Sequence, residues 1–380
     1  MKEIEKKLPK PYSLKILTSL IGYGIYLPAQ IIQQQLAASG IASEILVFEW
    51  LYDAEKKKTF SDSAAAYADN YKLAQLAAKI PVNYQASTDP ALVERLYQQW
   101  MQEEQTHFLC LSGLWFAILK NYHPPFALKT INCCRMDAGQ AHTWSNEHQL
   151  VIDRSYFLFD IQLKKINYAF HIPELKHIPY AKRSKNIVIH GGGWGLGDFI
   201  TKTAALADAG YHRNILIKSL NKYRPDDTQT SYYLNDPDWD ILNKNSSSSP
   251  FPAIGHIHHR DDISYFHHDH YHPVLDLINQ SKAIISKPGG MTLTDSLITG
   301  TPLIYLDPMG ENEEGNAVIV NENKIGMSFE KWKNDNFSLQ TIHELHKNIV
   351  TLQSDLPDFI ATFKHDISRY SDNGSIRSFF

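Results

Sequence analysis

The 380-residue sequence is poor in cysteine and has no excess of basic residues. Its three cysteines, Cys110, Cys133 and Cys134, form no CxxC pair. This argues against a disulfide framework or a zinc ribbon and favours a reducing compartment. The 37 basic residues are outnumbered by 41 acidic residues, which gives a net charge of −4. Binding to a nucleic-acid backbone is therefore not expected.

Long apolar segments are also missing. No run of about 18 apolar residues predicts a membrane span, and the charged start, MKEIEKKLPKPYSLK, lacks the apolar core of a signal peptide. We expect a cytoplasmic protein. The early lysines leave two interpretations open: peripheral contact with an anionic membrane surface, or a solvated tail whose charge Glu3 and Glu5 dilute.

What the sequence does contain is two series of short apolar runs that alternate with amphipathic stretches, a pattern typical of α/β units with parallel sheets. We expect strands at 14–20, 44–48, 107–111 and 128–133 in the first unit, and at 186–190, 215–218, 283–286 and 303–306 in the second. Helices are predicted from Pro28 to Gly40, and at 64–79, 91–105 and 198–209. The predicted domains are 1–165 and 186–355, joined by a linker at 166–185 and followed by a C-terminal segment, 356–380.

The first strong motif is a glycine-rich turn between a predicted strand and a predicted helix, with Gly191, Gly192, Gly193, Gly195 and Gly197. Backbone N–H groups can approach a phosphate in such a turn, although tight turns also use glycine for steric reasons alone. The region 213–224 lacks the acid of a dinucleotide site, and Gly197-Asp198-Phe199 does not match a Walker A loop. The absence of these two motifs therefore argues against NAD and against a nucleotide bound in a P-loop.

A second glycine turn follows about a hundred residues later in SKPGGMTLTD, residues 286–295, again between a strand and a helix. Neighbouring parallel strands place their carboxyl ends at one edge of the sheet, so the amides of the two turns are expected to converge on one ligand. A diphosphate fits this arrangement. Asp295 has two interpretations: Thr292-x-x-Asp295 matches a capping box, or the carboxylate accepts hydrogen bonds from ribose hydroxyls.

A third segment, GENEEGNA at 310–317, places acids and amides at another helix start, where simple complementarity to the helix dipole is the alternative explanation. Together, SKPGGMTLTDSLITGTPLIYLDP, GENEEGNA and GGGWGLG resemble the inverting GT-B glycosyltransferases, a group that includes monogalactosyldiacylglycerol synthase, bacterial diacylglycerol glucosyltransferases and MurG. The resemblance implies two Rossmann-like domains facing a central cleft. The first would bind the acceptor and the second a UDP-sugar, and a C-terminal helix would cross back to the first domain.

The resemblance also implies roles for individual residues on the donor side. Asp295 would hold the ribose, in place of the more usual Glu, and Lys287 would add positive charge near the leaving UDP. Glu313, Glu314 and Asn316 would face the donor sugar or its diphosphate. The remaining donor-side candidates are Gly191, Gly192, Gly193, Gly195, Gly289, Gly290, Met291 and Thr292.

The acceptor side matches the group less fully. Met136-Asp137 with His142 and Trp144 resembles its Thr-Asp…His…Trp stretch. In the first glycine turn the group has Gly-Gly-x-His, whereas this chain has Gly22-Tyr23-Gly24-Ile25. Because the expected histidine is missing, we predict His142, oriented by Asp137, as the base. The alternative is that His142 is an ordinary surface histidine.

Two further clusters invite a metal interpretation that we do not favour. Seven histidines lie between His256 and His272, without an HExxH motif or a cysteine partner, and Asp236, Asp238 and Asp240 have DxD spacing. No metal and no cofactor is expected.

The sequence therefore predicts transfer of a hexose from a UDP-sugar, with inversion, to a hydroxyl or amine of a lipid or small-molecule acceptor. The alternatives are a UDP-sugar 2-epimerase-like enzyme and a non-catalytic sugar-nucleotide-binding or scaffold protein.

Overall fold

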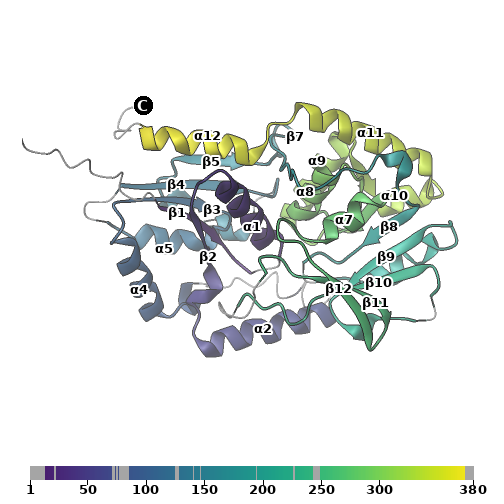
Figure 1. Cartoon of the computed structure of the whole chain (residues 1–380), viewed down its shortest axis with the longest axis horizontal. Helices are drawn as coiled ribbons and strands as arrows, with labels where there is room; N and C mark the ends of the chain where they lie inside the picture. The colour runs from purple at the N-terminus through teal and green to yellow at the C-terminus, as the bar shows by residue number, and fades with distance from the viewer. Residues whose placement is uncertain are drawn as a thin grey trace, which may run out of the picture.

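The computed structural model describes residues 13–20, 23–70, 73, 76, 85–124, 128–139, 141–145, 147–193, 195–225, 227–242 and 249–372. Two α/β units lie side by side, each built around its own sheet (Figure 1). No helix in these ranges is both long and apolar enough to cross a membrane.

The first sheet has five parallel strands in the order β2-β1-β3-β4-β5. They are β1 (Ser13–Thr18), β2 (Ser43–Val47), β3 (Gln105–Cys110), β4 (Leu128–Arg135) and β5 (Arg154–Phe157). All four predicted strands of this unit are present, because continuous apolar runs are typical of a sheet buried on both faces. The chain reverses its winding direction between β1 and β3, which opens a crevice at their carboxyl ends.

The helices of the first unit differ from the prediction mainly at their ends. The principal helices are α1 (Tyr23–Ala38), α2 (Ala54–Asp69), α4 (Pro90–Trp100) and α5 (Phe116–Asn121). We predicted that Pro28 begins this helix, but it lies inside α1. Its missing N–H costs one helical hydrogen bond, to the carbonyl of Gly24. Burial of the face that carries Ile31 and Ile32 offsets this cost.

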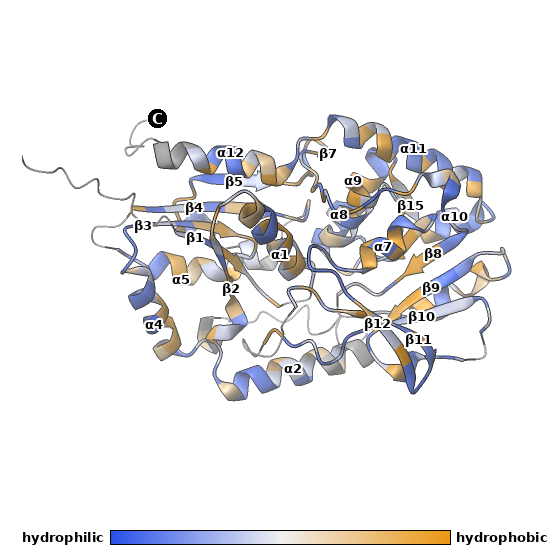
Figure 2. Ribbon diagram, in the orientation of Figure 1, coloured by the Kyte–Doolittle hydropathy of each residue, from blue (hydrophilic) through white to orange (hydrophobic). Residues whose placement is uncertain are grey.

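The second sheet has eight strands in the order β12-β11-β10-β9-β8-β13-β14-β15. Its strands are β8 (Asn186–Ile189), β9 (His212–Ile217), β10 (Thr230–Asn235), β11 (Ile254–His259), β12 (Asp262–Phe266), β13 (Ala283–Ser286), β14 (Leu303–Tyr305) and β15 (Gly326–Ser328). Its principal helices are α6 (Phe199–Lys202), α7 (Val274–Asn279), α8 (Gly290–Thr299), α9 (Glu311–Glu322), α10 (Phe329–Asn334) and α11 (Leu339–Asp355). Figure 2 shows the central strand β8 as strongly hydrophobic.

This sheet is parallel except at one edge, which corrects the predicted fully parallel arrangement. β11 and β12 form an antiparallel hairpin. The hairpin contains part of the histidine-rich stretch, for which no strand was predicted. Ile254 and Ile257 of β11 are buried, whereas His258 and His259 are exposed. A hairpin at the edge of a sheet exposes one face to solvent, and the polar side chains of that face make its composition similar to that of a loop.

The predicted helix at 198–209 is also shorter than expected, because α6 ends at Lys202 and a 3₁₀ turn, Ala204–Leu206, replaces its continuation. The Oγ1 of Thr203 donates to the carbonyl of Phe199 at 2.7 Å. Such back-bonding bends or interrupts helices.

The C-terminal helix α12 (Phe359–Asp372) lies over the first sheet, although α11, which precedes it, belongs to the second unit (Figure 1). The Tyr156 hydroxyl donates to Asp366 at 2.7 Å, and the Tyr156 ring packs edge-on against Phe359 with centroids 5.4 Å apart. An apolar cluster that includes residues of α1, α7, α8 and α12 connects the two units. The two units are therefore joined by a shared apolar cluster and by the C-terminal helix.

Candidate active site

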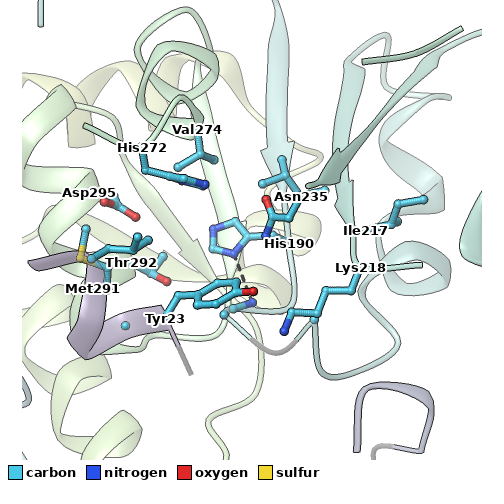
Figure 3. Close-up of a pocket in the computed structure, with 16 residues that line it drawn as sticks. Tyr23, His190, Ile217, Lys218, Asn235, His272, Val274, Met291, Thr292 and Asp295 are labelled. Carbon is cyan, nitrogen blue, oxygen red and sulfur yellow. Dashed lines mark hydrogen bonds between the residues drawn. The ribbon is translucent and has the colours of Figure 1, made fainter. Parts of the chain in front are cut away.

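A pocket lies at the carboxyl ends of β8 and β13, where the second sheet reverses its winding direction. It encloses about 610 Å³ of space, including part that is open to solvent. Residues from the second unit form most of its wall, and Tyr23, Gly24 and Leu27 of α1 reach it from the first unit (Figure 3). The pocket is thus a feature of the cleft between the units.

The turn at 191–197 forms one side of the pocket, with Gly192, Gly193 and Gly195 in the lining. Gly192 and Gly195 have φ angles of 73° and 64°, a left-handed conformation that favours glycine. Two amides of this turn donate within the turn itself. Gly195 donates to the carbonyl of Gly192, and Leu196 donates to that of Gly191, each at 2.9 Å. Trp194 lies outside the described residues.

Asp295 lies in the same pocket, and its position excludes the capping box. α8 begins at Gly290 with Gly289 as its N-cap, so Thr292 is already inside the helix and Asp295 is in its second turn. Asp295 is 5% exposed, and its Oδ1 has no hydrogen-bond partner among the described residues. Burial raises the pKa of this carboxyl to about 8. A buried acid in this state is suited to a ligand that brings its own hydroxyl donors.

The positive charge in the pocket comes from Lys218, which follows β9, and not from Lys287. No acidic side chain in the described ranges pairs with Lys218, and burial lowers the pKa of its amine to about 8. Its Nζ lies 4.8 Å from the centre of the Tyr23 ring. Tyr23 belongs to the first unit, so this contact crosses the cleft. The sequence offered no signal for Lys218 beyond its place at the end of a predicted strand.

Two histidines complete the wall, and the sequence motifs did not identify either as a site residue. His190 directly follows β8, and its Nδ1 accepts from the Gly192 amide at 3.1 Å. The Nε2 of His190 and both ring nitrogens of His272 are buried without a partner in the described part of the chain. Burial lowers the pKa of His190 to about 4 and that of His272 to about 3. Both rings are therefore neutral in the empty pocket.

The second glycine turn is used differently from the prediction. The N–H of Gly290 donates to Oδ1 of Asp137 at 3.0 Å, across the cleft. A methyl group on Gly290 would lie 2.2 Å from the carbonyl oxygen of Met136. Met291 and Thr292 face the pocket, whereas Gly289 and Gly290 are not among its lining residues. The two turns thus flank one cleft, but the second turn mainly joins the units.

Asn316 reinforces this junction. Its Nδ2 donates to Asp137 at 2.7 Å and to the carbonyl of Pro288 at 2.8 Å, and its Oδ1 accepts from the amide of Ala138 at 2.8 Å. The side chain is fully buried. Its hydrogen-bonding groups are therefore used by the protein itself, not held open for a donor sugar as the resemblance implied.

The remaining donor-side candidates are close to this junction. Lys287 lies 3.6 Å from Glu313, whose other carboxylate oxygen accepts from the Met309 amide at 2.7 Å. Glu314 is exposed on α9. Lys287 therefore already has an acidic partner, which weakens the expectation that it neutralises the leaving group.

The acceptor-side candidates are only partly described. His142 begins a short 3₁₀ helix, His142–Trp144, but its side chain lies outside the described part, as does Gly22 altogether. The carboxylate of Asp137 is held by donors from the second unit. Glu49, which follows β2, was not predicted: it is fully buried, one oxygen accepts from the Leu20 amide at 2.8 Å, and burial raises its pKa to about 7.

Neither metal interpretation gains support from the geometry. No group of three or more His, Cys, Asp or Glu in the ranges described is arranged to hold a metal ion. Asp236 and Asp240 accept from backbone amides two residues further on, of Asp238 and Leu242. These acids therefore stabilise local turns.

No family model and no curated protein matches the chain. Among solved structures, the glycotransferase of kitacinnamycin aligns with 96% of this chain and 100% of its own at 9% identity, with a TM-score of 0.52. MurG from Acinetobacter baumannii aligns with 94% of this chain and 99% of its own at 12% identity, with a TM-score of 0.49. The first of these likenesses, together with the two sheets flanking a cleft, shows the GT-B fold and confirms the predicted fold class.

Proposed function

We propose that this protein is an inverting glycosyltransferase that moves a hexose from a UDP-sugar to a hydroxyl or amine of a lipid or small-molecule acceptor. The observation that carries the proposal is the set of polar groups facing the cleft pocket without partners among the described residues. Asp295 offers a buried carboxyl group to ribose hydroxyls, and Lys218 offers a cation to the diphosphate. A ligand without an anionic group would leave the charge of Lys218 uncompensated.

The reaction needs the donor and the acceptor to meet between the two units. The acceptor oxygen or nitrogen attacks the anomeric carbon, and the bond from that carbon to the diphosphate oxygen breaks with its electron pair on the departing UDP. The acceptor's proton passes to a base. Lys218 lies in the pocket beside the 191–197 turn, where it can stabilise the charge on the leaving group.

For the base we keep His142 as the proposal. The segment that carries it leaves β4 at the carboxyl edge of the first sheet, and residues 137–139 of that segment contact the second unit directly. His142→Ala should lower kcat and leave the donor Kd unchanged. Glu49→Gln is the comparison, because Glu49 lies at the same sheet edge. A loss of kcat in Glu49→Gln alone would move the role to Glu49.

The proposal is tested by incubating the protein with UDP-, TDP- and GDP-sugars, with and without lipid and soluble acceptors, and measuring the free nucleoside diphosphate and the product anomer. Acceptor-dependent release of UDP with an inverted product supports it. Epimerisation without UDP release would identify an epimerase, and binding without turnover would identify a non-catalytic binder.

Asp295→Ala tests the pocket itself. We expect UDP affinity to fall by about 10-fold, since a hydrogen bond between uncharged groups contributes up to about 1.5 kcal/mol. Titration calorimetry with UDP measures the change. His258→Gln, a change of an exposed side chain on β11, is the matched control and should bind UDP like the unaltered protein. Unchanged affinity in Asp295→Ala would remove the ribose from this site.

A further inference from the structure

Several backbone amides of the two glycine turns already donate to acceptors within the protein. In the 191–197 turn, the amides of Gly192, Gly195 and Leu196 already donate to acceptors within the turn or to His190. At the start of α8, the Gly290 amide donates to Asp137. Side chains that line the pocket can therefore add to what the remaining amides offer a diphosphate.

His190 and His272 are placed where their side chains can contact a diphosphate. His190 and His272 both line the pocket, and their rings lie next to each other in its wall (Figure 3). They are close enough that a charge on His190 lowers the pKa of His272. The Nδ1 of His190 accepts from Gly192, so its neutral ring carries the proton on Nε2. Protonating His190 at Nδ1 would break the contact with Gly192, whereas His272 has two ring nitrogens without a described partner.

We propose that His190 and His272 face the diphosphate of the donor, and that His272 takes up one proton from solvent when the donor binds. This inference rests on the proposed function. The proton would add a positive charge beside the leaving group while the site is occupied and would return to solvent when UDP departs. His190 stays neutral and donates through Nε2.

Four other ionisable groups face the pair and bear on its charge. Lys287 after β13 is close enough to lower the pKa of His190, and Lys218 after β9 lines the same pocket. Asp295 of α8 is held protonated by burial, and Tyr23 of α1 has a pKa raised to about 12. The empty pocket therefore keeps His272 neutral, and the incoming negative charge of a diphosphate reverses that balance.

Titration calorimetry with UDP-glucose at pH 7, in buffers of different ionisation enthalpy, measures the protons taken up on binding. UDP-glucose is the appropriate probe because both of its phosphates are esterified, whereas the terminal phosphate of UDP titrates with a pKa near 6. We expect His272→Gln to take up fewer protons than the unaltered protein, by about 0.5–1 per ligand bound. Any proton that Asp295 releases on binding is released in both proteins, so it does not affect the difference in proton uptake between them.

His190→Asn is the matched variant, because its Oδ1 can replace Nδ1 as the acceptor from Gly192. It should weaken binding and retain most of the proton uptake. His258→Gln should alter neither quantity. Should His272→Gln fail to fold, imidazole ¹³C and ¹⁵N shifts of the unaltered protein provide a second measurement. One histidine should pass from the neutral to the cationic form on addition of UDP-glucose.

Two outcomes separate this inference from the proposed function. If UDP-glucose binds and the proton uptake is the same in the unaltered protein and in His272→Gln, the inference is overturned and the donor site stands. If no nucleotide sugar of the panel binds, the proposed function fails and the inference with it.

Discussion

The two strand-to-helix turns of the second unit both contain adjacent glycines but use them for different physical reasons. In the 191–197 turn, Gly192 adopts a left-handed φ of 73°, and no described atom lies within 4 Å of the place a Cβ would take. At Gly290 the backbone of Met136 fills that place. The first turn needs the conformational freedom of glycine, and the second needs its small volume. A glycine cluster alone therefore does not indicate which turn faces a ligand.

Substituting the two glycines gives the largest expected contrast. We expect Gly290→Ala to lower the free energy of unfolding by about 3 kcal/mol, the upper end of the usual cost of overpacking, because the obstructing atom belongs to the backbone. Gly192→Ala should cost only about 1 kcal/mol, the penalty of a left-handed conformation. Urea unfolding of both variants measures the difference. Equal losses would mean that the second turn is not packed against Met136 as described.

The two lysines sharpen the same comparison. Lys218→Met should weaken UDP-glucose binding by roughly 30-fold, about 2 kcal/mol, because it removes a cation from the pocket. It should not destabilise the fold, since burial disfavours that charge.

Lys287→Met should have the opposite effects, with a loss of stability and little change in UDP-glucose binding. It leaves the mostly buried Glu313 without its cation and should lower the free energy of unfolding by about 1–2 kcal/mol, less than for a fully buried pair. Its effect on UDP-glucose binding should stay below about threefold. For both Lys218→Met and Lys287→Met, calorimetry measures the affinity for UDP-glucose and urea unfolding measures the free energy of unfolding. A strong loss of binding in Lys287→Met alone would return the phosphate role to the second turn.

The pH dependence of stability gives an effect that accumulates gradually over several pH units. The pKa of Asp295 is raised to about 8 in the folded state, compared with about 4 for an unperturbed Asp. The folded state therefore binds more protons between these values, and the contribution of Asp295 to stability is full below about pH 4 and is lost as the pH rises toward 8.

The slope of this loss should approach about 1.4 kcal/mol per pH unit. Asp295→Asn should lack the slope, so the difference in unfolding free energy between the unaltered protein and the variant should change steadily from pH 5 to 8. Urea unfolding at several pH values measures it. A constant difference would show that Asp295 is not held in its protonated form.

The sequence by itself determined the central strands and the order of the motifs. The strand predicted at 283–286 is β13 without any shift of its ends, because it is an apolar run bounded by a turn. The sequence did not predict edge elements such as the β11–β12 hairpin, because the polar side chains on their solvent-exposed face give them the composition of a loop. The first helix was placed too late because its interior proline looked like a helix start.

Only the tertiary structure decided which polar groups are left for a ligand. Asp137 and Gly290 are 153 positions apart in the chain, and their hydrogen bond removes both from the set of groups open to a donor. The pairing of Lys287 with Glu313 and the burial of Lys218 and His272 likewise depend on how the units pack. Local patterns specify which residues can bind a phosphate. Long-range packing determines which of them already have a partner, and this decides where the charge of a ligand can be met.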